Sequence, residues 1–139
     1  MLQIQGLSKH FGKLQVLDQI DLELEGKGIV AILGPNGSGK TTLIKCLLGM
    51  VIPKDGNISW NNQNILGESN YRNQLNYLPQ IAQFPSNISV RELIAMIKDL
   101  RPLKANENTL INRFGLESQL NKKLGNLSGG TKQKVNLVL

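Results

Sequence analysis

The stretch that decides the fold is Gly34-Pro35-Asn36-Gly37-Ser38-Gly39-Lys40-Thr41. It satisfies the pattern G-x-x-x-x-G-K-[ST], a P-loop, whose glycines let successive backbone N–H groups turn toward phosphate oxygens. In this pattern Lys40 neutralises the β and γ phosphates of a nucleotide, and the Thr41 hydroxyl contributes an oxygen to Mg²⁺. The stretch therefore predicts a nucleotide site, to which the next residue, Thr42, also belongs.

The residues on either side of the P-loop have the patterns that it requires. Five apolar residues, Ile29 to Leu33, precede it without alternation, which predicts a strand covered on both faces inside a parallel sheet. Apolar residues at helical spacing follow from Lys40 to Met50, and the positive end of that helix would attract phosphate. A glycine-rich turn that matches by chance is the alternative, and the order of strand, loop and helix disfavours it.

More β structure is predicted on both sides of this core. At the beginning of the chain Leu2 and Ile4, and later Leu22 and Leu24, alternate with polar neighbours. This period of two is typical of half-buried strands and predicts an antiparallel layer. Two further strands are predicted at Ile58 to Trp60 and at Leu75 to Leu78.

Helical patterns dominate after Pro79. Ser89 followed by Glu92 is a capping box, and it opens a helix that Pro102 is expected to end. Weaker helical candidates follow, and then a loop that leads into a last helix. These segments are Asn108 to Phe114, Ser118 to Leu124, the loop Ser128 to Gly130, and the helix from Thr131.

Composition and charge exclude several classes of protein. The chain has 139 residues, 40% hydrophobic and 19% charged, which is typical of one soluble domain. No apolar run approaches the roughly 18 residues of a membrane-spanning helix and no leader pattern is present, so a cytoplasmic protein is expected. The net charge of +6 is scattered and aromatic residues are 4%, so no nucleic-acid partner is expected. The single cysteine, Cys46, is expected to be buried.

A second motif, Leu127-Ser128-Gly129-Gly130, lies far downstream of the P-loop. It resembles the LSGGQ signature of ABC ATPases, and its separation from Lys40, without an intervening coiled coil, is similar to that of transporter subunits. Alone, such a string is as often a plain loop, and its weight comes from the P-loop before it. The chain thus resembles the N-terminal portion of an ABC transporter nucleotide-binding domain. This resemblance implies ATP and Mg²⁺ as cofactors and ATP hydrolysis coupled to transport.

Two more residues match motifs of that family. Phe11 matches the aromatic residue that stacks on adenine, although an isolated aromatic would more often be a core residue. Gln80 matches the glutamine of the Q-loop, which reaches Mg²⁺ and the attacking water. The resemblance implies Lys40, Gln80 and Ser128 as catalytic residues, and Thr41 and Gln80 as metal ligands. The implied ATP-binding residues are Phe11, Gly34, Pro35, Asn36, Gly37, Ser38, Gly39, Lys40, Thr41, Thr42, Ser128, Gly129 and Gly130.

The resemblance also implies an architecture. The expected fold is an α/β P-loop NTPase of the ABC ATPase type, with an N-terminal antiparallel β part and a helical subdomain. Residues 1–80 would hold the β part and the P-loop core, residues 81–125 the helical subdomain, and residues 126–139 the signature loop and the start of its helix.

The resemblance implies partners as well. Two subunits, as a homodimer or a pseudo-dimer, would pair head to tail, with Ser128 of one closing over the ATP that Lys40 of the other holds. A membrane-spanning transporter subunit is a further implied partner. The apolar loop of Ile81, Phe84 and Ile88 could belong to the core or could face a helix of that subunit, and its composition slightly favours the subunit. The protein is therefore expected in the cytoplasm, at the inner face of the cell membrane.

The chain departs from the family pattern in two respects. Thr131 stands where the signature has glutamine, with Gln133 two residues later. The acidic Walker B strand with its catalytic glutamate, and the switch histidine, would lie after Leu139. The domain is therefore expected to be C-terminally incomplete, with apolar surface exposed, and this chain alone is expected not to turn over ATP.

Two alternatives stay open. One is a cytosolic ABC-type ATPase that acts on ribosomes or DNA, although such proteins usually carry two ATPase units. The other is an unrelated P-loop kinase in which Ser128 to Gly130 is a plain loop. The transported substrate is not written in the sequence, and the Asn36-Gly37 pair slightly favours export-type relatives.

Overall fold

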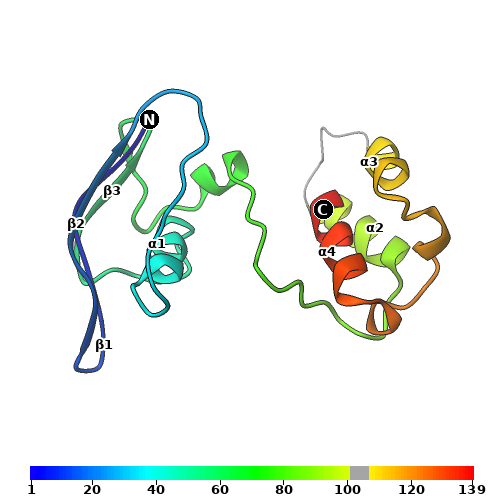
Figure 1. Cartoon of the computed structure of the whole chain (residues 1–139). Coiled ribbons are helices and arrows are strands. Elements are labelled where there is room, and N and C mark those ends of the chain that lie inside the picture. Colours follow the sequence, from blue (N-terminus) through cyan, green and yellow to red (C-terminus); the bar gives the residue numbers. More distant parts are fainter. Residues whose placement is uncertain (101–106) are drawn as a thin grey trace. The chain divides into compact units, whose positions relative to one another are not determined.

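A computed structural model describes residues 1–100 and 107–139, and the chain divides into two units, Met1–Asn76 and Tyr77–Leu139. Among the described residues, the first unit contains a β-sheet and one α-helix, and the second contains three α-helices (Figure 1). Pro102, the predicted end of a helix, lies outside the described residues.

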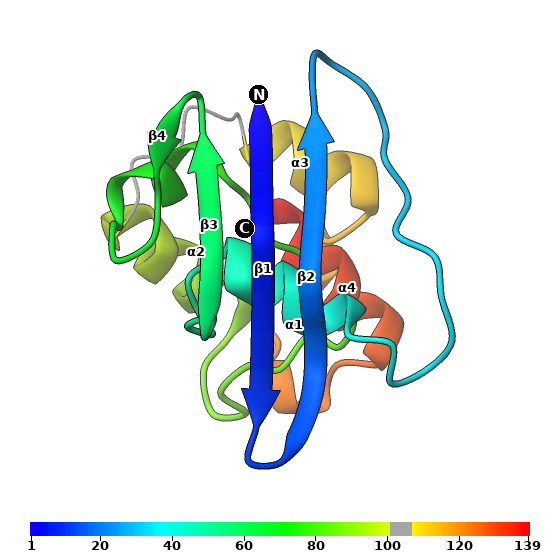
Figure 2. The ribbon, with the colours of Figure 1, turned by 90° about the vertical axis from the view of Figure 1, so that its left-hand side faces the viewer.

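An antiparallel sheet organises the first unit. Its strands are β1 (Leu2–Phe11), β2 (Leu14–Leu24), β3 (Asp55–Trp60) and β4 (Gln63–Asn64), in the order β2-β1-β3-β4. Figure 2 shows β1 between β2 and β3. Leu2 pairs with Leu24 and Ile4 pairs with Leu22, so the antiparallel layer predicted from the alternation is confirmed.

The helix α1 (Lys40–Leu47) packs its apolar residues against those of the sheet. The buried residues of this core are Ile4, Leu7, Leu17, Leu43, Cys46, Ile58, Ile65 and Tyr71. Full burial of one such aliphatic side chain contributes about 1.5–3 kcal/mol to stability. The expected burial of Cys46 is confirmed, at 1% exposure. This packing fixes the helix that begins directly after the P-loop.

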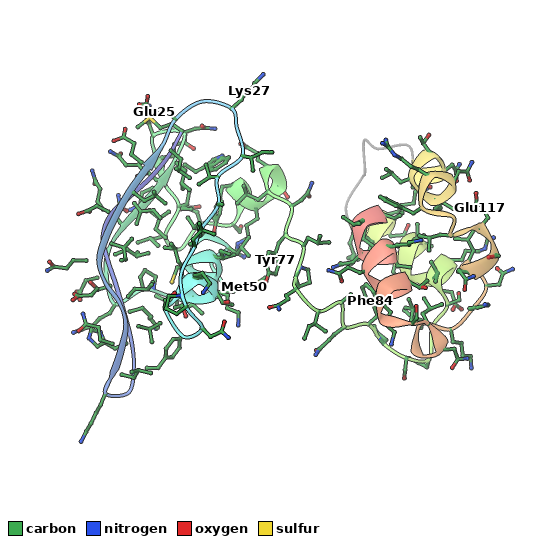
Figure 3. The ribbon with its side chains drawn as sticks, viewed as in Figure 1. Glu25, Lys27, Met50, Tyr77, Phe84 and Glu117 are labelled. Carbon is green, nitrogen blue, oxygen red and sulfur yellow. The ribbon has the colours of Figure 1, made fainter. Side chains whose placement is uncertain are left out.

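Gly49 ends α1 earlier than predicted. The apolar spacing extends the helix to Met50, but α1 ends at Leu47, and the Met50 N–H donates to the Lys45 carbonyl oxygen at 2.9 Å. Gly49 has a φ of 66°, which completes a Schellman closure and favours a residue without a Cβ. Met50 is consequently exposed beyond the helix (Figure 3).

The chain's single tryptophan, Trp60, lies at the end of β3. A tight hairpin follows it, in which Asn61 and Asn62 have φ of 49° and 64°, as a two-residue type I′ turn requires. The Trp60 indole N–H donates to Oε1 of Gln74 at 3.0 Å, in the short helix η1 (Asn70–Gln74). The environment of the Trp60 indole, and so its fluorescence, therefore depends on both β3 and η1 being folded.

The segment Ile29 to Leu33 is not the buried strand that its apolar run predicts. It has no strand pairing, and Ile29 and Leu33 are 101% and 88% exposed. A buried parallel strand needs neighbouring strands to bond its N–H and C=O groups. In the part of the chain that the structure describes, the strands of the sheet all pair antiparallel with one another, and none of them pairs with this segment. The apolar run therefore lies open to solvent.

Two shorter predictions are also wrong. Leu75 to Leu78 forms no strand, since no described strand lies beside it to pair with. Ser118 to Leu124 forms no α-helix, and two 3₁₀ turns stand there instead, η2 (Glu117–Gln119) and η3 (Leu124–Asn126). The carbonyl oxygens of Leu120 and Lys122 accept the N–H groups of Arg91 and Val90, at 2.9 and 3.2 Å. In an α-helix the Leu120 carbonyl oxygen would accept the Leu124 N–H, but here it accepts the Arg91 N–H, and the Leu124 N–H donates to the Ile88 carbonyl oxygen at 2.8 Å.

In the described residues of the second unit, three α-helices pack around its core: α2 (Val90–Leu100), α3 (Glu107–Phe114) and α4 (Gly129–Val138). Their buried residues, with those of the turns between them, are Val90, Leu93, Ile94, Ile111, Leu116, Leu124, Leu127, Val135 and Val138. The helices predicted after Ser89, at Asn108 to Phe114 and from Thr131 are confirmed, with boundaries shifted by a residue or two. None of the described helices is long and apolar enough to cross a membrane.

The predicted capping box at the start of α2 is confirmed. The Ser89 N–H donates to Oε2 of Glu92 at 2.7 Å, and the Glu92 N–H donates to Oγ of Ser89 at 3.2 Å. The bond from the Ser89 backbone N–H, followed by that from its hydroxyl, holds the pKa of the Glu92 carboxyl below its usual value.

This capping box makes the stability of α2 depend on pH. Because the folded pKa of Glu92 is lowered, its carboxylate stabilises the helix above the unfolded value of 4.5, and this contribution is lost as the pH falls through the folded pKa. We expect Glu92→Gln to make helix loss on acidification less steep below about pH 5, as measured by far-ultraviolet circular dichroism. Equal steepness in the two proteins would contradict this role.

Candidate functional site

The P-loop leads directly into α1, and Gly39 is the last residue before the helix. Gly39 is buried and has a φ of 88°. A Cβ at this position would lie 2.7 Å from the carbonyl oxygen of Val16 and 2.9 Å from Cδ2 of Leu17, both in β2. Glycine alone satisfies both the left-handed backbone and this close approach. The sheet therefore sets where α1 begins, and with it the position of Lys40.

The ammonium group of Lys40 lies against the loop that precedes it. Nζ donates to the carbonyl oxygens of Gly34 and Pro35 at 2.8 and 2.7 Å, and to Oγ of Ser38 at 3.4 Å. These contacts occupy the three donors of an ammonium group, so an incoming phosphate must take over at least one of them. The long contact to Ser38 is the weakest and the easiest to replace.

Backbone N–H groups at the start of α1 complete an anion site. The first intrahelical bond runs from the Leu43 N–H to the Gly39 carbonyl oxygen at 2.8 Å, so the N–H groups of Lys40, Thr41 and Thr42 have no partner within this fully described helix. Its first turn, all of which is described, contains no acidic residue to oppose the positive end of the helix dipole. These are the groups with which helix N-termini bind phosphate.

Phe11 lies on the surface at the end of β1. Its exposed fraction is 51%, so it is not the core residue that an isolated aromatic would more often be. The Lys9 ammonium group lies 5.1 Å from the centroid of the ring and also donates to the Ile52 carbonyl oxygen at 2.7 Å. A cation–π contact of this kind restricts the ring. Phe11 is thus an exposed, oriented ring, and its stacking on adenine stays a prediction.

In the second unit, Ser128 is the N-cap of α4. Its Oγ accepts the Thr131 N–H at 3.2 Å and lies 2.9 Å from Oγ1 of Thr131. Thr131, which stands where the signature has glutamine, therefore pairs its hydroxyl with Ser128. The first intrahelical bond of α4 runs from the Lys132 N–H to Ser128 O at 2.9 Å, after the exposed residues Gly129 and Gly130. This helix start offers a second set of N–H groups for an anion.

Gln80 is exposed in an irregular segment of the second unit. Ile81 is exposed as well. Phe84 (Figure 3) and Ile88 instead pack against the core of this unit, so the core reading, and not the favoured partner-facing one, holds for these two residues. The residue before Gln80 is held in place, because Nε2 of Gln133 donates to the Pro79 carbonyl oxygen at 3.1 Å. No local sequence pattern indicates this contact, because Gln133 is distinguished in the sequence only by its position after Thr131.

The structure gathers the predicted residues into two separate groups. Gly34 to Thr42 form one loop and helix start in the first unit, and Ser128 to Gly130 form the start of α4 in the second. Phe11 and Gln80 are each on the surface of their own unit. The roles of all these residues remain predictions.

Comparisons with known proteins show which family the chain is similar to. A family model described as "ABC transporter" matches residues 17–139. The chain is 30% identical over 145 residues to the ABC transporter ATP-binding protein YhaQ of Bacillus subtilis (strain 168), covering 99% of this chain and 47% of that protein. It is 32% identical over 139 residues to the sulfate/thiosulfate import ATP-binding protein CysA of Mesostigma viride, covering 96% of this chain and 40% of that protein.

A solved structure described as an ATP binding subunit of an ABC transporter superposes on the chain with a TM-score of 0.85 and 29% sequence identity. The superposition covers 99% of this chain and 60% of that one. The chain thus spans less than half the length of these two curated relatives and 60% of this solved chain.

Proposed function

Because the chain belongs to the ABC transporter family, we propose that it carries the ATP site of a subunit that hydrolyses ATP to power a membrane transporter. The observation that carries this proposal is the P-loop. The Lys40 ammonium group donates to the Gly34 and Pro35 carbonyl oxygens. The N–H groups of residues 40–42, at the start of α1, have no partner within the helix. A concentrated set of donors with no acid in the first turn suits a polyphosphate.

Phosphoryl transfer to water needs positioning and charge neutralisation more than covalent chemistry. Lys40 would neutralise the β and γ phosphates, and the backbone of Gly34 to Thr42 would orient them. The Thr41 hydroxyl and the Gln80 side-chain oxygen are hard donors of the kind that Mg²⁺ prefers beside phosphate oxygens and water. Mg²⁺, when bound, would neutralise charge on the phosphates. Phe11 would stack on the adenine.

The second group of residues suits a site shared by two subunits. We propose a head-to-tail pair in which Ser128, Gly129 and Gly130 of one subunit bind the γ phosphate held by Lys40 of the other. The exposed start of α4 supports this arrangement, because Ser128 and its two glycines face solvent. The Thr131 hydroxyl would orient the Ser128 hydroxyl, with which it shares a hydrogen bond of 2.9 Å.

A membrane-spanning subunit completes the proposed assembly, which would lie in the cytoplasm at the inner face of the cell membrane. Relatives named as transporter and import ATP-binding proteins support this reading over a ribosome- or DNA-directed ATPase and over a P-loop kinase. The export preference drawn from Asn36-Gly37 stays a prediction, and the import name of the CysA relative runs against it.

A mixing experiment tests the shared site. Lys40→Ala and Ser128→Arg should each abolish ATP hydrolysis by the complete subunit, and an equal mixture should recover about a quarter of the parent rate. About half of randomly mixed pairs are heterodimers, and each heterodimer has one site with both Lys40 and Ser128 intact. Phosphate release at steady state measures the recovery.

The two variants assayed separately are the controls for this experiment. A mixture no more active than its components would contradict the shared site. Full activity of Ser128→Arg alone would show that the loop before α4 only connects helices.

A further inference from the structure

One side chain of α4 bonds the segment that carries Gln80. Nε2 of Gln133 donates to the carbonyl oxygen of Pro79 at 3.1 Å, and the contact is partly buried. Both residues belong to the second unit. The contact joins Pro79, the residue before the predicted metal-binding residue Gln80, to the helix that Ser128 caps.

This hydrogen bond acts on Gln80 directly, because its acceptor belongs to the peptide group that links Pro79 to Gln80. A peptide group is planar, so a bond that fixes the Pro79 carbonyl also fixes the plane of the Gln80 N–H. Pro79 has a fixed φ, and Leu78 before it is confined to extended conformations. The Pro79 carbonyl is therefore a stiff point in an otherwise irregular segment, and holding it fixes the direction of the N–Cα bond of Gln80.

Gln133 also stands on a particular face of α4. It follows Gly129 by four residues and Gly130 by three, so the three lie on the same side of the helix. A helical side chain leans toward the N-terminus, here toward the two glycines that the proposed function places on the γ phosphate. The side chain that holds the Gln80 segment thus comes from the phosphate-facing side of α4.

Gln133 is not needed to hold α4 in place. The helix is anchored by Val135 and Val138, which are 0% and 4% exposed, and Leu127 just before it is also buried. These apolar contacts supply most of the docking energy, to which one partly exposed hydrogen bond adds little. The specific effect of the Gln133 bond is on the peptide group that it contacts.

We propose that Gln133 is a positioning residue that aligns Gln80 with the signature end of α4, so that the predicted metal ligand and the predicted phosphate-binding residues of this unit keep a fixed relative geometry. The proposal rests on the proposed function for its catalytic consequence, whereas the positioning can be measured without it.

The chain offers a matched control on the same helix. Nζ of Lys134 donates to the Phe114 carbonyl oxygen at 3.2 Å, so it too bonds α4 to a distant backbone carbonyl, but at the end of α3. Gln133→Met removes the donor and keeps the length of the side chain. Gln133→Lys keeps a long donor, and Lys134→Met removes the control bond.

Nuclear magnetic resonance relaxation on the chain tests the positioning. In Gln133→Met the backbone order parameter at Gln80 should fall into the flexible range, below about 0.6, while α4 keeps its values. Gln133→Lys and Lys134→Met should both keep the parent value at Gln80. An unchanged order parameter in Gln133→Met, or an equal fall in Lys134→Met, would overturn the proposal.

ATP turnover by the complete subunit tests the consequence. Gln133→Met should lower kcat about tenfold, the loss of one well-placed hydrogen bond, while KM for MgATP stays within about twofold. Gln133→Lys should restore most of kcat, and Lys134→Met should keep the parent rate. A shift in KM alone, or no rescue by Gln133→Lys, would overturn the proposal. If the parent subunit does not hydrolyse ATP, the proposed function fails. The order parameter at Gln80 then tests, by itself, whether Gln133 positions the Gln80 segment.

Discussion

Lys40→Ala should weaken MgATP binding at least about a hundredfold and leave the fold intact. Two charge-assisted hydrogen bonds to phosphate would be lost, each contributing about 1.5–3 kcal/mol, and about 1.4 kcal/mol corresponds to a factor of ten. The fold should survive because the Lys40 ammonium contacts only the exposed loop that precedes it, at the Gly34 and Pro35 carbonyl oxygens.

Titration calorimetry on both proteins measures this change. Lys45→Ala is the matched control, since it removes the same charge from the exposed face of the same helix without altering the loop. Its affinity should stay close to that of the parent chain. Unchanged affinity in Lys40→Ala would show that residues 34–41 do not bind phosphate in the proposed manner.

Gly39→Ala should have the largest effect on stability among single changes in the P-loop. The new Cβ would stand 2.7 Å from the Val16 carbonyl oxygen, a backbone atom of β2 that cannot move aside without disturbing the sheet. It would also impose the strain of a left-handed residue, since φ is 88°. Together these terms amount to about 3 kcal/mol, the overpacking and the backbone strain contributing in similar measure. Nucleotide binding should be lost with the displaced start of α1.

Gly37→Ala separates the backbone strain from the close contact of the new Cβ. Gly37 has nearly the same φ, 85°, but nothing lies within 4 Å of the position that its Cβ would take. It should therefore cost only the backbone strain, about 1.5 kcal/mol. Urea unfolding followed by the fluorescence of Trp60, which lies in the same unit, measures both variants. Equal destabilisation by the two changes would mean that the approach of Gly39 to β2 does not constrain the loop.

Sequence patterns predicted the elements whose partners are near in the chain or whose chemistry is local. The alternation around Ile4 and Leu22 gave the antiparallel pair, and Ser89 with Glu92 gave the start of α2. The predicted α/β fold of the ABC ATPase type is confirmed by the solved ATP binding subunit, with a TM-score of 0.85.

Patterns failed where a segment depends on distant neighbours. Ile29 to Leu33 has the composition of a buried strand, but a segment forms such a strand only where neighbouring strands bond its N–H and C=O groups. Among the described residues no strand pairs with it. Ser118 to Leu124 has helical spacing, but its carbonyl oxygens bond the first turn of α2. In both segments a hydrogen-bonding requirement outside the segment decided the structure.

The candidate site divides in the same way. The P-loop was predictable because its glycines, its lysine and the following helix are consecutive, so one stretch of backbone builds the whole anion site. The bond from Gln133 to Pro79 was not, because it joins residues that are close only after the second unit has folded.

The burial of Cys46 makes its reactivity a measure of motion. The sulfur lies in α1, on the side packed against the sheet, and burial raises the pKa of its thiol, an effect that the Lys9 ammonium partly offsets. Only a thiolate attacks an alkylating reagent, so covalent labelling waits until the helix opens and the sulfur meets water. The labelling rate of the Cys46 sulfur therefore measures how frequently α1, the helix that carries Lys40, separates from the sheet.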